Sequence, residues 1–238
     1  MDVHEPFFID DNILNTSEER SPSGRFSLKI ITYKTKEGCW NYTKGILSNE
    51  SSKIAEVYRN YSTFHHSFFN KDNHEWIQTG STYMSQTFIN LDTGEVFDNS
   101  EKLKQTEAYK KGYCFCWCRS KVSPDGKTIA VNGCYWGASY EIKFFDLSDM
   151  NNIVELDCSE DIYDDDLDFN WNPDGTFTCI HYREFSRSLG KFFDEFSSDD
   201  EIPENEDDDF EKLVHRAQTF ERNGNKMELV PSSLRESE

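Results

Sequence analysis

Three cysteines alternate with aromatic residues in the segment Cys114-Phe-Cys-Trp-Cys118, and cysteine thiolates are common zinc ligands. In a β-strand the three side chains would share one face, with neighbours about 6.6–7 Å apart. Thiolates on one zinc ion each lie about 2.3 Å from the metal, so they sit closer together than this spacing allows. We therefore interpret these cysteines as small buried core residues. The sequence predicts no metal site and no other cofactor.

A run of acidic residues from Asp164 to Asp168 could bind a cation. An EF-hand loop counted from Asn170 would need a glutamate at its twelfth position, where His181 stands instead. Polar and apolar residues alternate over 167–171, which is typical of a half-buried strand. We interpret the run as part of a surface strand, and a weak divalent-cation site is the alternative. The candidate ligands of that alternative are Asp164, Asp165, Asp166 and Asp168.

Histidines could supply a general base. His65, His66 and His74 lie among aromatic residues, but the chain has no Gly-x-Ser-x-Gly segment that would present a nucleophile. Glycine-rich phosphate-binding motifs are absent as well. We interpret the histidines as structural. The alternative is a hydrolase-like enzyme in which His65, His66 or His181 lies beside several Asp carboxylates.

The segment Gly133-Cys-Tyr-Trp-Gly-Ala138 places two large aromatic residues between glycines. Tyr135 and Trp136 could pack in the core or be displayed at a surface. Displayed aromatic residues are typical of protein-binding hot spots. Core packing is the favoured interpretation, and Tyr135 and Trp136 are retained as candidate partner-binding residues.

Regularly spaced turns indicate how these residues are positioned. Turn-forming residues recur at 21–24, 70–73, 123–126 and 172–175, and the last residues lie 49, 53 and 49 positions apart (24 to 73, 73 to 126, 126 to 175). Strand-forming residues follow each turn. These segments cover 26–33, 75–79, 127–131 and 176–182, with second strands at 87–91 and 140–147. Such a period is typical of four-stranded sheet repeats.

The segment Ser123-Pro-Asp-Gly-Lys-Thr-Ile-Ala-Val, followed by Tyr140-Glu-Ile-Lys-Phe-Phe-Asp-Leu, resembles a blade of WD40 and related β-propellers. It departs from WD40 proteins because Phe145-Asp146 stands where Trp-Asp closes the strand. Residues 112–149 are also similar to uncharacterised proteins of bacteria and large DNA viruses. The resemblance implies an all-β fold of four related β-units, in a propeller-like or curved-sheet arrangement, that binds partners through its loops.

The C-terminal fifth differs in composition. Acidic residues without Lys or Arg dominate 194–209, which predicts an acidic linker after a propeller-like β domain over 1–193. Apolar residues at helical spacing predict an amphipathic helix over 210–222, followed by a flexible tail over 223–238. The helix could dock on the sheet or bind a partner. Its candidate contact residues are Phe210, Leu213, Val214 and Ala217.

Composition narrows the function. A formal charge of -20 argues against direct binding to nucleic acid or to an anionic membrane. The N-terminal residues do not resemble a secretory signal, and seven cysteines then suggest reduced thiols in the cytoplasm. We predict a non-enzymatic protein-interaction module. Its partner would be a protein, and that partner could be basic. The alternatives are the hydrolase-like enzyme and an acidic inhibitor or nucleic-acid mimic.

Overall fold

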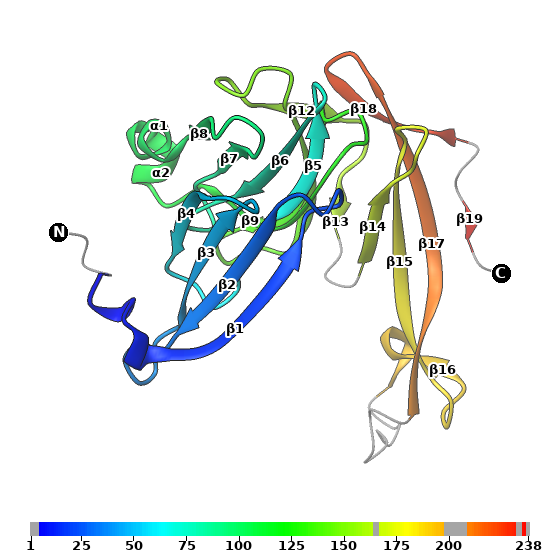
Figure 1. The fold of residues 1–238 in the computed structure, drawn as a ribbon. Coiled ribbons are helices and arrows are strands. Elements are labelled where there is room, and N and C mark those ends of the chain that lie inside the picture. Colours follow the sequence, from blue (N-terminus) through cyan, green and yellow to red (C-terminus); the bar gives the residue numbers. More distant parts are fainter. Residues whose placement is uncertain (1–4, 164–166, 198–208, 232–234, 237–238) are drawn as a thin grey trace. The chain divides into compact units, whose positions relative to one another are not determined.

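The computed structural model describes residues 5–163, 167–197, 209–231 and 235–236. It divides into two compact units, Met1–Glu155 (unit 1) and Leu156–Glu238 (unit 2). Strands predominate in both, with only short helices, so the all-β prediction is confirmed (Figure 1). The predicted single β domain over 1–193 did not include a division at residue 155. Across the described ranges, no helix has the length and apolar character needed to cross a bilayer.

Unit 1 contains three antiparallel sheets that follow one another along the chain. The first consists of β1 (Ile13–Arg20), β2 (Ser27–Tyr33), β3 (Tyr42–Ser48) and β4 (Lys53–Arg59). The second consists of β5 (Ser67–Lys71), β6 (His74–Thr79), β7 (Thr87–Asn90) and β8 (Val96–Asp98). The third contains β9 (Phe115–Val122), β10 (Thr128–Tyr135) and β11 (Glu141–Asp146). In each sheet, sequential strands pair as neighbours.

Short helices and one further strand complete unit 1. Two 3-10 turns, η1 (Glu5–Phe7) and η2 (Asp10–Asn12), precede β1. Helices α1 (Ser100–Gln105) and α2 (Glu107–Lys110) connect the second sheet to the third. Strand β12 (Val154–Cys158) spans the division between the units.

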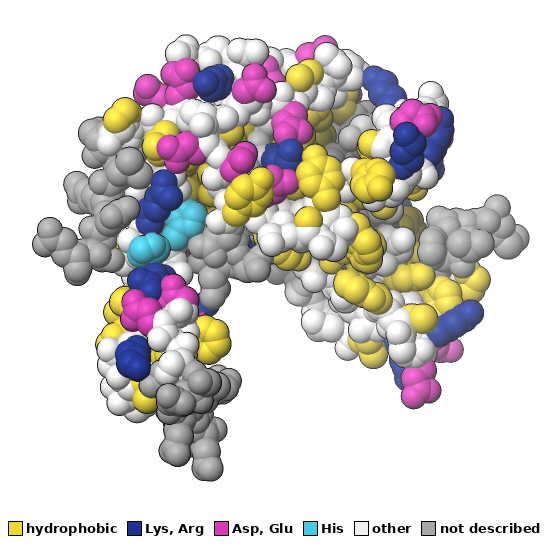
Figure 2. Space-filling view, turned by 180° about the vertical axis from the view of Figure 1, so that it is seen from behind, with side chains coloured by type: hydrophobic (Ala, Val, Ile, Leu, Met, Phe, Trp, Pro, Cys, Tyr) yellow, Lys and Arg dark blue, Asp and Glu magenta, His cyan; other side chains and the backbone are white. Residues whose placement is uncertain are grey.

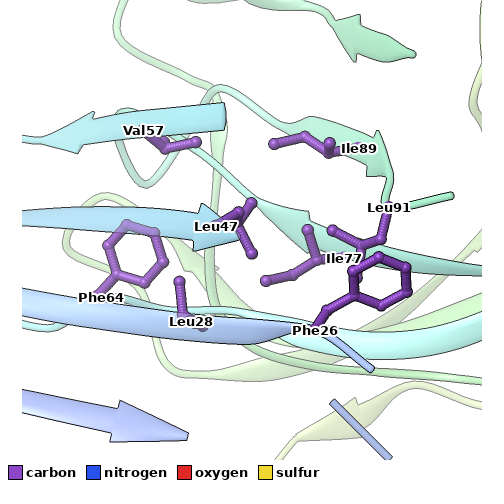
Figure 3. Close-up of a cluster of buried hydrophobic side chains, with 8 residues drawn as sticks. All are labelled: Phe26, Leu28, Leu47, Val57, Phe64, Ile77, Ile89 and Leu91. Atoms are coloured by element: carbon purple, nitrogen blue, oxygen red, sulfur yellow. The ribbon is translucent and has the colours of Figure 1, made fainter. Parts of the chain in front are cut away.

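The second sheet has hydrophobic clusters on both of its faces. One cluster joins it to the first sheet and contains Phe26, Leu28, Leu47, Val57, Phe64, Ile77, Ile89 and Leu91 (Figure 3). The other joins it to the third sheet and contains Phe69, Trp76, Phe88, Trp117, Ile129, Val131, Leu147 and Met150. Burial on both faces explains why β7 reads as a continuous buried run rather than an alternating one. The three sheets therefore stack face to face in chain order.

The predicted turns are confirmed. Gly24 donates its N–H to Ser21 O at 2.8 Å, and Gly126 donates to Ser123 O at 2.9 Å. Both glycines have positive φ, which explains the residue type. Residues 72–73 connect β5 to β6 with positive φ at both positions, as a tight hairpin requires. The turn at 172–175 also forms, with Gly175 N–H on Asn172 O at 3.0 Å.

Unit 2 is built around a sheet in which β15 pairs with β14 and β17, and β17 pairs with β18. Its strands are β14 (Leu167–Trp171), β15 (Phe177–Ser186), β16 (Lys191–Phe192), β17 (Phe210–Asn223), β18 (Lys226–Leu229) and β19 (Arg235–Glu236). Strand β13 (Ile162–Tyr163) and a 3-10 turn, η3 (Phe193–Glu195), complete it. The alternating burial of β14 confirms the predicted half-buried strand.

The predicted helix over 210–222 is wrong, because β17 occupies these residues. The strand pairs with β15 over ten residue pairs, from Phe177–Phe220 to Ser186–Phe210. A register shift skips His215, so the more buried positions step from Leu213 to Arg216. The bulge places Val214 and Ala217 on one face of the strand although they are three residues apart, a spacing that also suits a helix.

The predicted tail and linker are corrected in part. Strand β18 lies within the tail over 223–238, and its Met227 is fully buried, so this part is ordered structure. Within the predicted linker over 194–209, Asp194 forms an ion pair with Arg183, and Asp209 accepts a hydrogen bond from Ser186 Oγ at 2.5 Å. Residues 198–208 lie outside the described ranges, as do Asp164, Asp165 and Asp166 of the alternative cation site.

Candidate functional site

The sheets of unit 1 have two different ends. At the turn end, tight turns connect the strands at 21–26, 72–73, 92–94 and 123–127. At the loop end, wider connections lie at 34–41, 60–66, 80–86, 99–114 and 136–140. Two of the loops touch, because Asn60 N–H donates to Ser81 O at 3.3 Å, and Trp117 N–H of β9 donates to Tyr83 O of the connection 80–86 at 2.8 Å.

Arg59 lies at the loop end of β4, where the sheet core stops. Val57 and Arg59 are buried and the intervening Tyr58 is exposed, so the arginine follows the core-facing register of the strand. Only 2% of Arg59 is exposed. Its Nη1 donates to Gly80 O at 2.7 Å and to Thr82 O at 3.1 Å. The guanidinium thereby holds the connection 80–86 against the end of β4.

The positive charge of Arg59 is surrounded by rings and carbonyl groups. Its Cζ lies 4.9 Å from the ring centroid of Tyr83 and 5.9 Å from that of Tyr61, which allows cation–π attraction. Within the described residues, Arg59 forms no ion pair with a carboxylate, and its Nε is buried without a hydrogen-bond partner. Burial lowers the pKa of Arg59, because the protonated form loses hydration.

The connection 80–86 has a compact conformation that the sequence specifies. Thr82 Oγ1 accepts from Ser85 N at 3.0 Å and lies 3.0 Å from Ser85 Oγ. Ser81 Oγ lies 3.0 Å from the same Ser85 hydroxyl. A Cβ on Gly80 would lie 2.0 Å from Ser85 O, so only glycine fits there without movement of the backbone. Hydroxyl groups and one glycine therefore fix the loop that Arg59 contacts.

A pocket of about 260 Å³ opens beside Arg59. Its lining comes from the N-terminal turns, the end of β4, the connection 80–86 and helices α1 and α2. The lining residues are Phe8, Tyr58, Arg59, Asn60, Ser81, Thr82, Ser85, Ser100, Leu103, Lys104 and Tyr109. Arg59 and Lys104 are its charged members, and no carboxylate is among these described residues. Asn60 Oδ1 is buried there without a hydrogen-bond partner.

Exposed aromatic residues surround the loop end. Trp136 is 72% exposed, Tyr113 is 68% exposed and Trp40 is 55% exposed. Tyr61 connects the rings of Trp40 and Tyr83, with centroid distances of 5.2 Å and 4.0 Å. The space-filling view shows hydrophobic side chains exposed among charged ones on one face of the molecule (Figure 2). We call the set Trp40, Tyr61, Tyr83, Tyr113, Tyr135, Trp136 and Tyr140 the aromatic rim.

The candidate partner-binding residues fall into two groups. Tyr135 and Trp136 belong to the aromatic rim, and Trp136 is displayed rather than packed in the core as the favoured interpretation held. Phe210, Leu213, Val214 and Ala217 lie on β17 of unit 2. Phe210 is half-buried against Phe193, with ring centroids 6.0 Å apart, whereas Val214 is 47% exposed. The strand therefore does not gather these four residues on one apolar face.

His65 forms a polar network instead of a catalytic pair. Its Nε2 lies 3.0 Å from Ser120 Oγ, which donates to Gln78 Oε1 at 2.7 Å. Because the hydroxyl proton of Ser120 is directed at Gln78, the imidazole donates to Ser120 rather than acting as its base. Burial, followed by the nearby charge of Arg59, lowers the pKa of His65 to about 3. His65 is therefore neutral at physiological pH.

The other histidines have different neighbours. His66 Nε2 lies 2.9 Å from Glu19 Oε1, and His181 Nε2 lies 3.0 Å from Gln218 Oε1. None of these contacts joins a histidine to a group of Asp side chains, the arrangement that the hydrolase alternative requires. Half-buried His74, at the turn end, lies 3.8 Å from Asp92.

Cys114 directly precedes β9, and Cys116 and Cys118 lie within it. Cys114 and Cys116 are buried, as predicted, and Cys118 is half-buried at a register shift opposite Asn132–Gly133. Burial and the neighbouring Cys134 raise the pKa of Cys116 to about 11, so its thiol is protonated at neutral pH. Within the described ranges, no cluster of three or more His, Cys, Asp or Glu residues has a geometry suited to a metal ion.

Arg59 and the connection 80–86 were missed in the sequence. The available signal was the alternation Ala55, Val57, Arg59, which places a charged residue in the core-facing register of a strand. A buried charge is more informative than a buried apolar residue, because it is rare and must be compensated.

Comparisons with known proteins identify a relative. No family model matches the chain. Among solved structures, a bifunctional GH43-CE protein of Bacteroides eggerthii is similar at 10% identity and a TM-score of 0.39. The match covers 95% of this chain and 27% of that one, so the chain spans about a quarter of that protein. A TM-score below 0.5 does not establish a common fold, and nothing about activity follows from it.

A curated relative is much closer in sequence. The chain is 39% identical over 234 residues to "Uncharacterized protein R762" of Acanthamoeba polyphaga mimivirus. The match covers 94% of this chain and 90% of the relative. The predicted similarity to proteins of large DNA viruses is thereby confirmed, whereas its extension to bacteria and to WD40 repeats is not supported by this match. The chain belongs to the same family as the mimivirus protein R762.

Proposed function

We propose that this chain is a non-enzymatic protein-interaction module and that its binding surface is the loop end of unit 1. The aromatic rim is the observation that carries the proposal. Large exposed aromatic residues are enriched in protein interfaces, where they bury much area with few rotatable bonds. Trp136 and Tyr113 are the most exposed rim residues, at 72% and 68%.

The sheet arrangement supports the same surface. Three stacked antiparallel sheets in chain order are the arrangement of successive propeller blades, and we propose that unit 1 is propeller-like. Proteins of this architecture commonly bind partners through loops at one end of their strands. The formal charge of -20 favours a partner whose contacting surface is basic overall.

The contacts of the candidate catalytic groups favour binding over catalysis. Ser120 directs its hydroxyl proton at Gln78, and His65 stays neutral because its pKa is about 3. A nucleophile needs an adjacent base that accepts its proton, and this pair does not provide one. We therefore favour the interaction module over the hydrolase alternative.

Affinity capture with matched variants tests the proposal. The tagged chain is compared with Trp136→Ala at the loop end and with Val96→Ala, which is 51% exposed beside the turn at 92–94. We expect a stoichiometric partner that Val96→Ala retains and that Trp136→Ala loses by about tenfold or more in affinity. Equal retention by both variants, or no partner with the wild-type chain, would contradict the proposal. A truncation before Asp194 is unsuitable, because it removes β17 and its fully buried Phe220.

A further inference from the structure

The pocket beside Arg59 is lined by positively charged residues, although the chain as a whole is acidic. The chain carries 45 acidic and 25 basic residues, yet the charged residues that line this pocket are Arg59 and Lys104. A second pocket, at the turn end, is lined by Arg25 together with Glu50 and Asp92. The pocket at Arg59 is therefore locally positive in an acidic protein.

The buried guanidinium has unused hydrogen-bonding capacity. The hydrogen bonds of Arg59 to Gly80 and Thr82 both come from Nη1, and Nε is buried without a hydrogen-bond partner among the described residues. An arginine presents five N–H donors, and a buried donor without an acceptor is costly. The contacts with Tyr61 and Tyr83 attract the charge but accept no such hydrogen bond. An anion in the pocket would offset the cost of burying this positive charge.

Two further groups extend the site. Lys104 Nζ lies 2.8 Å from Glu101, and the Glu101 side chain is 82% exposed. Because the pair is exposed, water screens the attraction between the two charges. Ser100 also lines the pocket and has a hydroxyl that can donate. Tyr109, Phe8 and Leu103 provide an apolar wall. The arrangement combines positive charge and donors with an enclosing surface.

We infer that the Arg59 pocket binds an oxyanion, the shared chemistry of phosphate and carboxylate groups. The guanidinium supplies charge and donors, Lys104 supplies a second positive charge at the entrance, and no lining carboxylate among the described residues opposes an anion. Arginine suits both groups because its planar N–H fork matches their oxygen spacing. The inference stands apart from the proposed interaction function, since a small anion can be tested on the purified chain alone.

Titration with inorganic phosphate and, separately, with acetate tests this inference. Backbone amide resonances are followed by NMR, with sodium chloride at equal ionic strength as the reference. We expect saturable shifts at 80–86 and 100–104 with at least one of the two anions. Binding of phosphate alone would assign a tetrahedral anion, and binding of acetate alone would assign a carboxylate. If neither anion moves these resonances beyond the chloride reference, the inference is wrong.

Two lysines provide a matched pair of variants. Lys104 and Lys110 lie on adjacent short helices, and each forms an exposed i, i+3 ion pair, at 2.8 Å and 3.0 Å. Of these two, Lys104 lines the pocket. We expect Lys104→Gln to weaken anion binding by about threefold and Lys110→Gln to leave it unchanged. Equal effects of the two variants would place the anion elsewhere.

Arg59→Lys tests the main donor while keeping the charge. A lysine cannot reproduce the planar fork, so we expect binding about tenfold weaker or more than in the wild-type chain. Wild-type affinity in a folded Arg59→Lys variant would overturn the assignment. If this variant does not fold, the comparison between Lys104→Gln and Lys110→Gln still decides the question.

Discussion

Two arginines of unit 1 show how differently its ends are built. Arg25, at the turn end, has a half-exposed side chain and forms ion pairs with both Glu75 and Asp92. Arg59, at the loop end, is 2% exposed and is held by two carbonyl groups and two aromatic rings. The exposed charge is fully compensated by carboxylates, and the buried charge is not.

The two ends also differ in how their buried polar groups are paired. At the turn end, Ser23 and Arg25 reach Glu75, and Asp92 accepts from Glu75 N at 2.8 Å, so the turns hold one another. Among the described residues, Arg59 Nε and Asn60 Oδ1 at the loop end are buried without a hydrogen-bond partner, and His74 Nδ1 at the turn end also has none but lies 3.8 Å from Asp92. Buried polar groups are usually satisfied in native proteins, and exceptions need an explanation. A ligand at the loop end supplies one.

Replacing each arginine by methionine should produce the largest contrast in stability. Arg59→Met leaves the carbonyls of Gly80 and Thr82 without their donor, and we expect unfolding free energy to fall by about 3 kcal/mol. Arg25→Met removes a solvent-exposed group and should have a much smaller effect. Urea unfolding of the three proteins measures both. A larger loss for Arg25→Met would mean that the turn-end network, and not the Arg59 contact, carries the stability of unit 1.

Two glycines separate backbone strain from close packing at the turn end. Gly24 and Gly126 have nearly the same φ, 76° and 70°, in similar turns. A Cβ on Gly24 meets nothing within 4 Å, whereas a Cβ on Gly126 lies 2.3 Å from Asn70 O. We expect Gly24→Ala to cost about 1 kcal/mol from strain alone and Gly126→Ala about 3 kcal/mol. Thermal unfolding compares them, and equal losses would show that the turns do not pack against each other.

Acidification should weaken the loop-end network through His65. An unfolded histidine binds a proton below about pH 6.5, whereas folded His65 does so only near its pKa of about 3. The unfolded state therefore binds more protons between these values, and stability falls as pH decreases through this window. His65→Gln removes this effect while keeping an N–H donor.

Urea unfolding of the wild-type chain and His65→Gln at pH 7 and pH 5 measures the effect. Relative to the wild-type chain, the variant should gain up to about 2 kcal/mol on acidification. The carboxylates titrate in both proteins, so their contribution cancels in the difference. Parallel changes in the two proteins would show that His65 becomes protonated in the folded state.

Alkylation of Cys39, at the loop end, should have the smallest effect of these changes. Cys39 is exposed beside Trp40, whereas Cys116 and Cys179 are buried and have pKa values raised to about 11 and about 12. Iodoacetamide at neutral pH should therefore modify Cys39 first, as read by mass spectrometry. Modification at Cys39 should also reduce partner capture. Unchanged capture would show that the partner does not contact the connection 34–41.

The sequence predicted the features that depend on local chemistry. Pro-Asp-Gly and related turns have specific backbone requirements, so the turns at 21–24 and 123–126 could be placed without the structure. Strand-forming segments next to them then gave β2, β6, β7, β10, β11 and β15 to within a few residues. The all-β class followed from these elements.

The remaining features depend on long-range pairing. Residues 210–222 carry apolar spacing that suits a helix, but they pair with β15 as a strand that a bulge at His215 interrupts. Arg59 escaped prediction because its burial depends on the connection 80–86, more than twenty residues away in the chain. The sequence also could not decide whether Trp136 is exposed, because glycine-flanked aromatic residues occur both in cores and at surfaces.

Hydrogen exchange of the chain, alone and bound to its captured partner, tests whether the loop end of unit 1 is the binding surface. We expect slower exchange on binding at 34–41, 60–66, 80–86 and 136–140, with little change at the turns 21–26, 72–73 and 123–127. Protection confined to the turns, or to unit 2, would contradict the assignment of the loop end as the binding surface.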